Sequence, residues 1–381
     1  MSDALPEGAL LTTRGFDQLL GALAGQGRTV IGPRARDGAI VLDEVTSAAD
    51  LPAGWTDDQG PGYYRLRRRD DDALFGFTTP STSWRPFLHP ARETVFRARL
   101  GGGGFEVEPP APAPRYAFVG VRACDLAGIA VQDRVLCGGS FADRGYAERR
   151  ADVVIIAADC SESGPTCFCA SMGTGPTAAA GFDLAVAERP GHEPRFHVRV
   201  GSTVGAELLA AVDHEPAGEQ DRRAAAADAA HAAATQVRSV PAGSVAGLLA
   251  ANLEHPQWDE VATRCLACTN CTMVCPTCFC TTVEDTVDLA GTTAERDQRW
   301  DSCFTLDFTL LGGTHVRGTV RSRYRQWLTH KLSTWEDQFG ELGCVGCGRC
   351  VTWCPVGIDL TEEVAAIAGT DGSGRPAGAP S

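Results

Sequence analysis

Two short cysteine-rich stretches, CLACTNCTMVCP at residues 265–276 and CVGCGRCVTWCP at residues 344–355, decide the fold of the C-terminal third of this chain. Each stretch holds four cysteines separated by two, two and three residues, and a proline follows the last one. Cysteines three positions apart in a tight loop can direct three thiolates to one face of a metal cluster. The fourth thiolate points away from that face, and the proline redirects the chain after it because its nitrogen carries no hydrogen.

This spacing is that of bacterial two-cluster ferredoxins, in which the fourth cysteine of each run binds the other cluster. The sequence therefore predicts two [4Fe–4S] clusters whose iron is held by eight cysteines. The expected ligands are Cys265, Cys268, Cys271 and Cys354 for the first cluster, and Cys344, Cys347, Cys350 and Cys275 for the second. Two structural zinc sites are the alternative, but a four-ligand zinc site requires neither the third cysteine step nor the proline.

Composition limits the class of protein. The chain has 381 residues, 44% of them hydrophobic, and its formal net charge is −14, which argues against nucleic acid or an anionic membrane as the main partner. The start of the chain has no basic region followed by a long apolar run, so we expect neither a signal peptide nor a membrane-spanning segment. The 16 cysteines are concentrated in CxxC and CFC groups. A reducing cytoplasm, with thiolates bound to metal, explains that usage better than disulfides do.

The N-terminal part of the sequence predicts an α/β region. Apolar spacing predicts a helix over 13–26 and strands over 29–32 and 39–45, whereas the turn-rich stretch 50–66 is expected to be irregular. The nearly continuous apolar runs 116–121 and 152–157 predict strands that are buried on both faces. With a helix between them they would form a βαβ unit, and hence a partly parallel sheet.

Four further cysteines are expected at the edge of that sheet. Cys124 follows the first buried strand and Cys160 the second, and ligands gather at the carboxyl ends of parallel strands. The loop after Cys160 adds Cys167 and Cys169. These four thiols predict a third [4Fe–4S] cluster, with Asp125 as an alternative ligand. A zinc site and a group of unligated buried thiols remain open, because this spacing is not a recognised cluster loop.

The region between the two cysteine runs is longer than in a small ferredoxin. Residues 277–343 separate them and include a helix-like stretch at 317–331, so we expect a mainly helical, ferredoxin-like C-terminal domain. Three cysteines there have no assigned role: Cys278, Cys280 and Cys303. Packing around a cluster is the favoured interpretation, and a redox-active set or a fourth metal site are the alternatives. Cys137 is expected to be structural.

The sequence suggests four regions. They are an N-terminal α+β region (1–108), an α/β domain with the predicted third cluster site (115–240), a two-cluster ferredoxin domain (241–368) and a disordered tail (369–381).

Several motifs together resemble a known family. They are VIGPRARDGAIVLDEV (30–45), GVRACD (120–125), CFCASMGTGP (167–176), CPTCFC (275–280) and WDSC (300–303). They are similar to those of the β subunit of cytoplasmic sulfhydrogenases, which are NAD(P)-linked nickel–iron hydrogenases. The A subunit of anaerobic sulfite reductase is a related protein that this chain also resembles.

The resemblance implies a subunit that relays electrons. Its partners would be a flavin subunit that binds NAD(P)H and either the small and large subunits of a nickel–iron hydrogenase or a sirohaem sulfite reductase subunit. The sequence shows no dinucleotide-binding glycine motif, Walker loop or haem attachment motif, which agrees with a non-catalytic electron-transfer role. Two alternatives remain: a sulfur-reducing subunit in which Cys278 and Cys280 attack polysulfide, and a zinc-stabilised scaffold.

Overall fold

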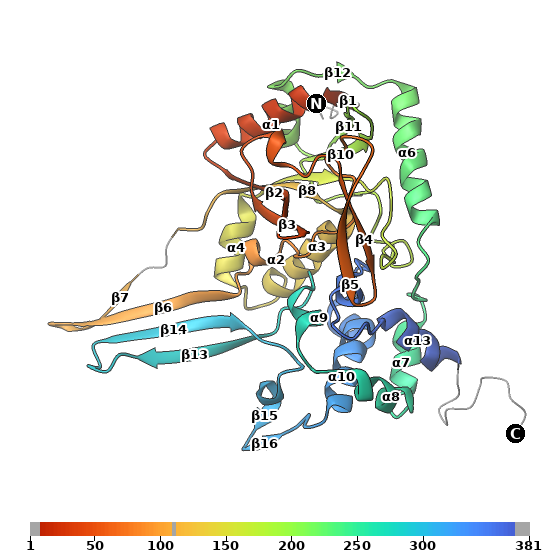
Figure 1. Cartoon of the computed structure of the whole chain (residues 1–381). Coiled ribbons are helices and arrows are strands. Elements are labelled where there is room, and N and C mark those ends of the chain that lie inside the picture. The colour runs from red at the N-terminus through yellow and green to blue at the C-terminus, as the bar shows by residue number, and fades with distance from the viewer. Residues whose placement is uncertain (1–7, 109–111, 370–381) are drawn as a thin grey trace, which may run out of the picture.

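A computed structural model describes residues 8–108 and 112–369. An eight-stranded mixed sheet forms the N-terminal region, in the order β12-β1-β11-β10-β9-β8-β2-β3 (Figure 1). The four central strands are parallel: β2 (Thr29–Arg36), β8 (Tyr116–Val121), β9 (Val154–Ala158) and β10 (Leu184–Arg189). Antiparallel strands complete both edges: β3 (Ala39–Glu44), β11 (Arg195–Val200), β1 (Ala9–Thr12) and β12 (Glu215–Pro216).

Apolar cores cover both faces of this sheet, which is why its central strands are continuously apolar. Val119 of β8 faces the core that contains Phe16 of α1 (Thr13–Gly25). The preceding residue, Phe118, faces the opposite core with Ile129 of α3 (Ala123–Cys137). Helices α4 (Arg144–Ala151) and α5 (Thr203–Ala210) add to the two cover layers. The partly parallel α/β sheet expected from the sequence is therefore present, and it takes strands from both the 1–108 and the 115–240 regions.

The stretch expected to be irregular is a β-hairpin instead, so that prediction is wrong. Strands β4 (Trp55–Gly60) and β5 (Tyr63–Arg68) pair on either side of a Pro61-Gly62 turn. The hairpin packs on the second cysteine run: Tyr64 stacks on Trp353 at 5.2 Å between ring centroids. The sequence of β4 is mostly polar and shows no alternation of apolar and polar residues. The strand therefore could not be recognised without its contacts to the rest of the fold.

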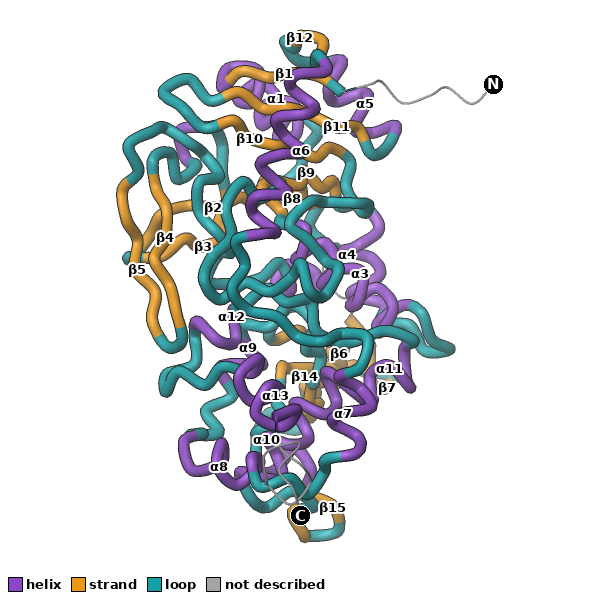
Figure 2. Tube along the Cα trace, turned by 90° about the vertical axis from the view of Figure 1, so that its right-hand side faces the viewer, coloured by secondary structure: helices purple, strands orange, loops and turns teal. Residues whose placement is uncertain are grey.

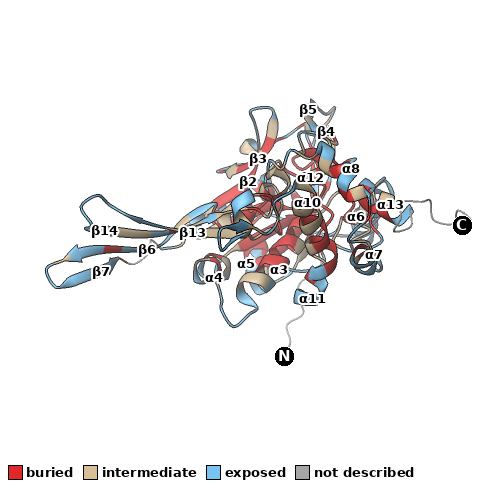
Figure 3. Cartoon of the chain, turned by 90° about the horizontal axis from the view of Figure 1, so that it is seen from below, coloured by how far each residue is buried: buried red, intermediate tan, exposed pale blue. Residues whose placement is uncertain are grey.

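A second sheet projects from the body as an arm. Strands β6 (Arg92–Gly101), β7 (Gly104–Glu108), β13 (Thr281–Val287) and β14 (Thr293–Trp300) form it, in the order β13-β14-β6-β7. Figures 1 and 3 show the arm extending away from the rest of the chain, with little buried surface compared with the body. The arm contains residues 281–300 of the insert between the cysteine runs, and the expectation of a mainly helical C-terminal domain is not confirmed.

The remaining helices surround the cysteine runs. Helices α7 (Val245–Ala251), α8 (Gln257–Arg264), α10 (Val320–Thr329) and α13 (Leu360–Gly369) share an apolar core with Trp258, Phe304 and Leu328. A π-helical turn (His330–Thr334) and α11 (Trp335–Phe339) continue from α10. Helix α6 (Glu219–Ala234) runs along the side of the sheet region toward these helices (Figure 2). The short elements are α2 (Arg85–Leu88), α9 (Asn270–Met273), α12 (Arg349–Thr352), 3-10 turns at Ala48–Asp50 and Leu306–Thr309, and the paired strands β15 (Leu310–Leu311) and β16 (Thr314–His315).

Within residues 8–108 and 112–369, no helix is both long and apolar enough to cross a membrane.

Candidate metal centres

The two cysteine runs share one backbone conformation. Left-handed residues occur at the third and fifth positions of each run: Ala267 and Thr269 in the first, Gly346 and Gly348 in the second. An alanine or threonine in this region costs about 1–2 kcal/mol, so the first run keeps a strained shape that the glycines of the second adopt freely. Backbone strain of this kind persists where the surrounding structure and function require it. Both runs are therefore shaped to turn three thiols toward one point.

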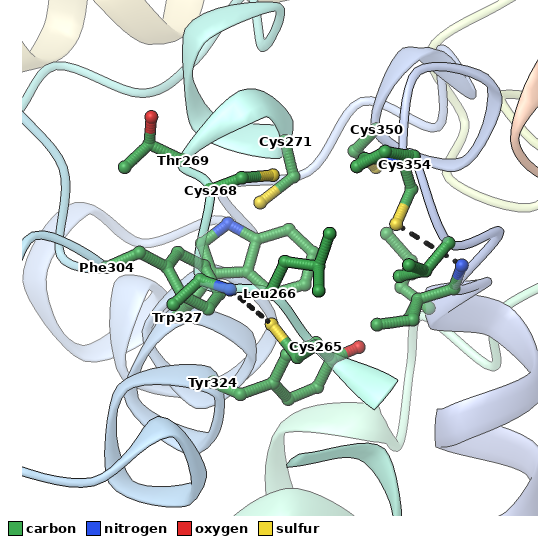
Figure 4. A pocket seen from close by; sticks show the side chains of 15 residues that line it. Cys265, Leu266, Cys268, Thr269, Cys271, Phe304, Tyr324, Trp327, Cys350 and Cys354 are labelled. Atoms are coloured by element: carbon green, nitrogen blue, oxygen red, sulfur yellow. Dashed lines mark hydrogen bonds between the residues drawn. The ribbon is translucent and has the colours of Figure 1, made fainter. Parts of the chain in front are cut away.

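The first run and the last cysteine of the second run line one cavity (Figure 4). Its cysteines are Cys265, Cys268, Cys271, Cys350 and Cys354. Burial and the neighbouring thiols of Cys265, Cys354 and Cys268 raise the pKa of the Cys271 thiol well above its usual value. The four ligands expected for the first cluster thus lie together, and the crossing ligand Cys354 is among them.

The walls of this cavity suit an inorganic cluster. They are aromatic and aliphatic, and two of their polar atoms are buried without a hydrogen-bond partner among the described residues, namely the Tyr324 hydroxyl and Trp327 Nε1. An unpaired buried donor costs free energy unless a bound group accepts from it. Sulfide and thiolate sulfur accept such bonds in iron–sulfur sites. The residues present therefore fit a [4Fe–4S] cluster here.

The second expected set also lies together. Burial and the nearby thiols of Cys344, Cys347 and Cys275 raise the pKa of the Cys350 thiol. Cys275 comes from the first run, so here too the crossing ligand reaches the other set. Among the described residues no group of three or more His, Cys, Asp or Glu side chains has the spacing that a single metal ion needs. A cubane places its own iron and sulfide atoms between the thiolates, which therefore stand further apart than around one ion.

A buried lysine, Lys331, also lies at this site, although it is not among the expected site residues. Its ammonium is buried and donates to Cys275 Sγ at 3.4 Å, Thr277 Oγ1 at 2.8 Å and the Gly343 carbonyl at 3.2 Å. The nearby Cys275, Cys278 and Cys344 thiols outweigh the effect of burial and raise the pKa of Lys331. Lys331 belongs to the π-helical turn, a feature that is frequent at functional sites. No local sequence signal predicts a lysine that points inward here.

The third set of cysteines converges at the carboxyl edge of the sheet. Burial and the Cys169 and Cys160 thiols raise the pKa of Cys167, and Cys124 is a neighbour of Cys169. Cys169 Sγ also accepts a hydrogen bond of 3.2 Å from Gln236 Nε2. The structure thus brings Cys124, Cys160, Cys167 and Cys169 together, as the strand order suggested.

This third set packs directly on the second cysteine run. Phe168 N donates to the Gly346 carbonyl at 2.9 Å, and a Cβ on Gly348 would lie 2.4 Å from the Thr166 carbonyl oxygen. The carboxylate of Asp125 accepts two hydrogen bonds, of 2.7 and 2.8 Å, from the buried Arg349 of the second run. Asp125 therefore joins α3 to the second run in this structure.

The three unassigned cysteines lie between the two main sets. The Cys278 thiol is hydrogen-bonded to that of Cys275, while Cys280 and Cys303 lie within hydrogen-bonding distance of each other. Arg85, which the sequence did not mark, donates to the Cys278 carbonyl at 2.5 Å and stacks 3.3 Å from the Trp300 ring centroid. Cys137 is exposed at the end of α3.

Comparison with known proteins agrees with this geometry. Residues 264–358 match the 4Fe-4S dicluster domain family. The chain is also 33% identical over 248 residues to sulfhydrogenase 2 subunit beta of Pyrococcus furiosus, a match that covers 64% of this chain and 72% of that protein. The chain belongs to the sulfhydrogenase β-subunit family. No solved structure is significantly similar to it.

Membership of this family fixes the general role. This sulfhydrogenase β-subunit homologue is an iron–sulfur protein that carries [4Fe–4S] clusters and takes part in electron transfer. The relative from Pyrococcus furiosus is named as a subunit of a sulfhydrogenase.

Proposed function

We propose that this β subunit relays electrons between a flavin subunit that binds NAD(P)H and a nickel–iron hydrogenase module. The observation that carries the proposal is that the last cysteine of each run lies with the first three cysteines of the other run. Cys354 of the second run lies with the first set and Cys275 of the first run lies with the second, so the two sets are adjacent. We assign the eight cysteines as ligands in these two sets, within a two-cluster domain at 241–368.

A third cluster is part of the proposal. Cys124, Cys160, Cys167 and Cys169 would hold it, because these thiols lie together and their loop packs on the second run. A bound [4Fe–4S] cluster supplies one-electron oxidation and reduction. The chain itself contributes thiolates, buried donors such as Trp327 Nε1, and an apolar shell that keeps water away. The reliance of so many thiols on metal also leads us to propose a reducing, cytoplasmic setting.

The arm offers a surface for another subunit of the complex. The strand registers place a set of apolar side chains on one face of the arm, around the ion pair between Asp285 and Arg296: Val283, Val287, Phe96, Leu100, Phe105 and Val107. Several of them are largely exposed in the part of the chain that the structure describes, including Phe105 at 61% and Val107 at 64%. The other face is charged and internally paired, as between Arg97 and Glu295. A broad uncovered apolar face indicates a protein partner.

Iron content tests the ligand assignment. Replacing Cys271 with Ser should remove one cluster from the first site, so that iron falls by about four per chain from an expected total of about twelve. Cys124→Ser should cause a similar loss at the third site. The exposed Cys137→Ser variant is the matched control and should keep full iron. Unchanged iron in Cys271→Ser would contradict the assignment.

Purification with native partners tests the complex. Affinity-tagged chain isolated anaerobically from its own cells should bring with it a flavin subunit and nickel–iron subunits, identified by mass spectrometry and metal analysis. Recovery of a sirohaem subunit instead would assign the chain to a sulfite reductase.

A further inference from the structure

We infer that Cys280 and Cys303 form a redox-active dithiol–disulfide couple between the two main cluster sites. The inference rests on the ligand sets assigned above, because it uses thiols that those sets leave free. The sequence left Cys278, Cys280 and Cys303 open as a redox-active set, and the structure brings Cys280 next to Cys303.

The geometry already holds the two thiols in position to bond. The two thiols are close enough to shift each other's pKa, and the backbone N–H of Cys303 lies near the Cys280 sulfur. The backbone joins the two segments as well, because Asp301 N donates to the Cys280 carbonyl at 2.8 Å. The arm hairpin between them begins with the pair Thr281 and Trp300, which fixes the separation of its two ends. A disulfide needs neighbouring backbones of this kind.

The pair also lies between the two main sets. Cys303 is close to Cys271 of the first set, and the preceding Ser302 bonds Thr272 Oγ1 at 2.8 Å. On the other side, Cys280 is close to Cys278, whose thiol contacts Cys275 of the second set. Electrons that pass between the sets would therefore pass close to this couple.

The exposure of the two thiols and the ionisation of Cys280 both favour reaction with a small disulfide. Both Cys280 and Cys303 are partly exposed, so a small molecule can reach them. A hydrogen bond from Cys303 and the positive charge of Lys331 lower the pKa of the Cys280 thiol. A thiolate is the form that attacks a disulfide sulfur.

The chemistry balances as a two-electron exchange. The Cys280 thiolate attacks one sulfur of a small molecule that contains an S–S bond and displaces the first thiolate. Cys303 then attacks the Cys280 sulfur of that mixed disulfide and displaces the second. Overall, two protein thiols are oxidised to one disulfide, and one S–S bond is reduced to two thiols. Two electrons from the iron–sulfur electron transfer of the family, with two protons, return the pair to the thiol form.

Thiol trapping in the complete, cluster-loaded protein tests the couple. The dithionite-reduced protein is freed of reductant, exposed anaerobically to glutathione disulfide or to inorganic tetrasulfide, denatured, and labelled with N-ethylmaleimide. Cleavage after Phe279, Trp300 and Phe304 separates Cys280 and Cys303 from all other cysteines. We expect a cross-linked pair of peptides containing these two residues, which disappears when the protein is reduced again. Formation with tetrasulfide alone would identify a small inorganic oxidant.

Serine variants distinguish the proposed dithiol couple from the proposed electron relay between clusters. Cys280→Ser and Cys303→Ser should each abolish the cross-link while iron content and the spectrum of the reduced clusters stay at wild-type values. Cys137→Ser should change neither. Absence of the cross-link in fully loaded protein would overturn the couple and leave the relay intact. A loss of iron in either Ser variant would overturn it as well, because the residue would then be a ligand.

Discussion

Lys331 shows how a single side chain can set the properties of a metal centre. Its ammonium donates to Cys275 Sγ and is buried among the thiols of the second set. A positive charge and an N–H···S bond both stabilise the reduced, more negative state of a cluster. The position of this lysine therefore favours electron acceptance at the second site.

Removal of the Lys331 charge should make the second cluster harder to reduce. We expect Lys331→Met to lower its midpoint potential by roughly 50–100 mV, and Lys331→Arg to retain most of the wild-type value. Redox titration followed by electron paramagnetic resonance measures both. An unchanged potential in a Met variant that still holds the cluster would show that Lys331 is only structural.

His89 should make stability depend on pH. It lies at the root of the arm, and burial, together with the charge of Arg85, lowers its pKa to about 4. Since the unfolded chain binds the proton with a pKa near 6.5, acidification below that value favours unfolding. The free energy of unfolding should fall by up to about 3 kcal/mol between pH 6.5 and 4 on account of this residue, and be unaffected by it above pH 6.5.

Calorimetry of the wild type and of His89→Gln checks this. The wild type should lose more stability than the variant between pH 7.5 and 5.5. Equal losses would mean that His89 is protonated as easily in the folded chain as in the unfolded one.

Among the secondary-structure elements, the two cysteine loops differ in how tightly they are surrounded. A Cβ on Gly348 would lie 2.4 Å from the Thr166 carbonyl oxygen, so this loop can accept no side chain where it meets the third set. At the corresponding position of the first loop, Thr269 is tolerated because that loop borders the cavity.

Substitutions in the two loops should therefore have opposite effects. Gly348→Ala should lower the midpoint of thermal unfolding and reduce the iron retained at the second and third sites. Ala267→Gly relieves a left-handed alanine and should be neutral or stabilise by about 1 kcal/mol. Thermal unfolding and iron analysis measure both; full iron in Gly348→Ala would contradict the packing described.

The elements that the sequence predicted are those with local signals. The apolar runs of β8 and β9, the amphipathic α1 and the spacing of the cysteines each depend on neighbouring residues. The arm could not be predicted, because β14 pairs with β6, which lies about two hundred residues earlier in the chain. The same holds for single contacts: Arg321 and Arg325 both pair with Glu254, about seventy residues earlier in the chain. The approach of Cys280 to Cys303 likewise exists only in the folded chain.

In the molecule as a whole, the arm projects away from the metal centres, but its base lies next to them. Within the arm, the hairpin of β13 and β14 begins one residue after Cys280 and ends three residues before Cys303. A partner bound to the apolar face of the arm would therefore lie next to the path that electrons take between the metal centres.

Charge placed on the apolar face should prevent assembly without loss of metal. We expect Phe105→Glu to abolish recovery of the partner subunits in affinity purification, since burying a carboxylate in an apolar interface is costly. Thr286→Lys, on the opposite face and across from Glu295, is the matched control and should assemble normally. Normal assembly of Phe105→Glu would show that this face is not the interface.

The electron paramagnetic resonance spectrum of the anaerobically reduced chain, recorded with iron analysis of the same sample, tests the central claim most directly. Two adjacent sets of thiolates that exchange ligands should give signals of reduced [4Fe–4S] clusters that interact magnetically, together with at least about eight irons per chain. A chain with zinc in place of iron and no reducible paramagnetic centre would contradict the account.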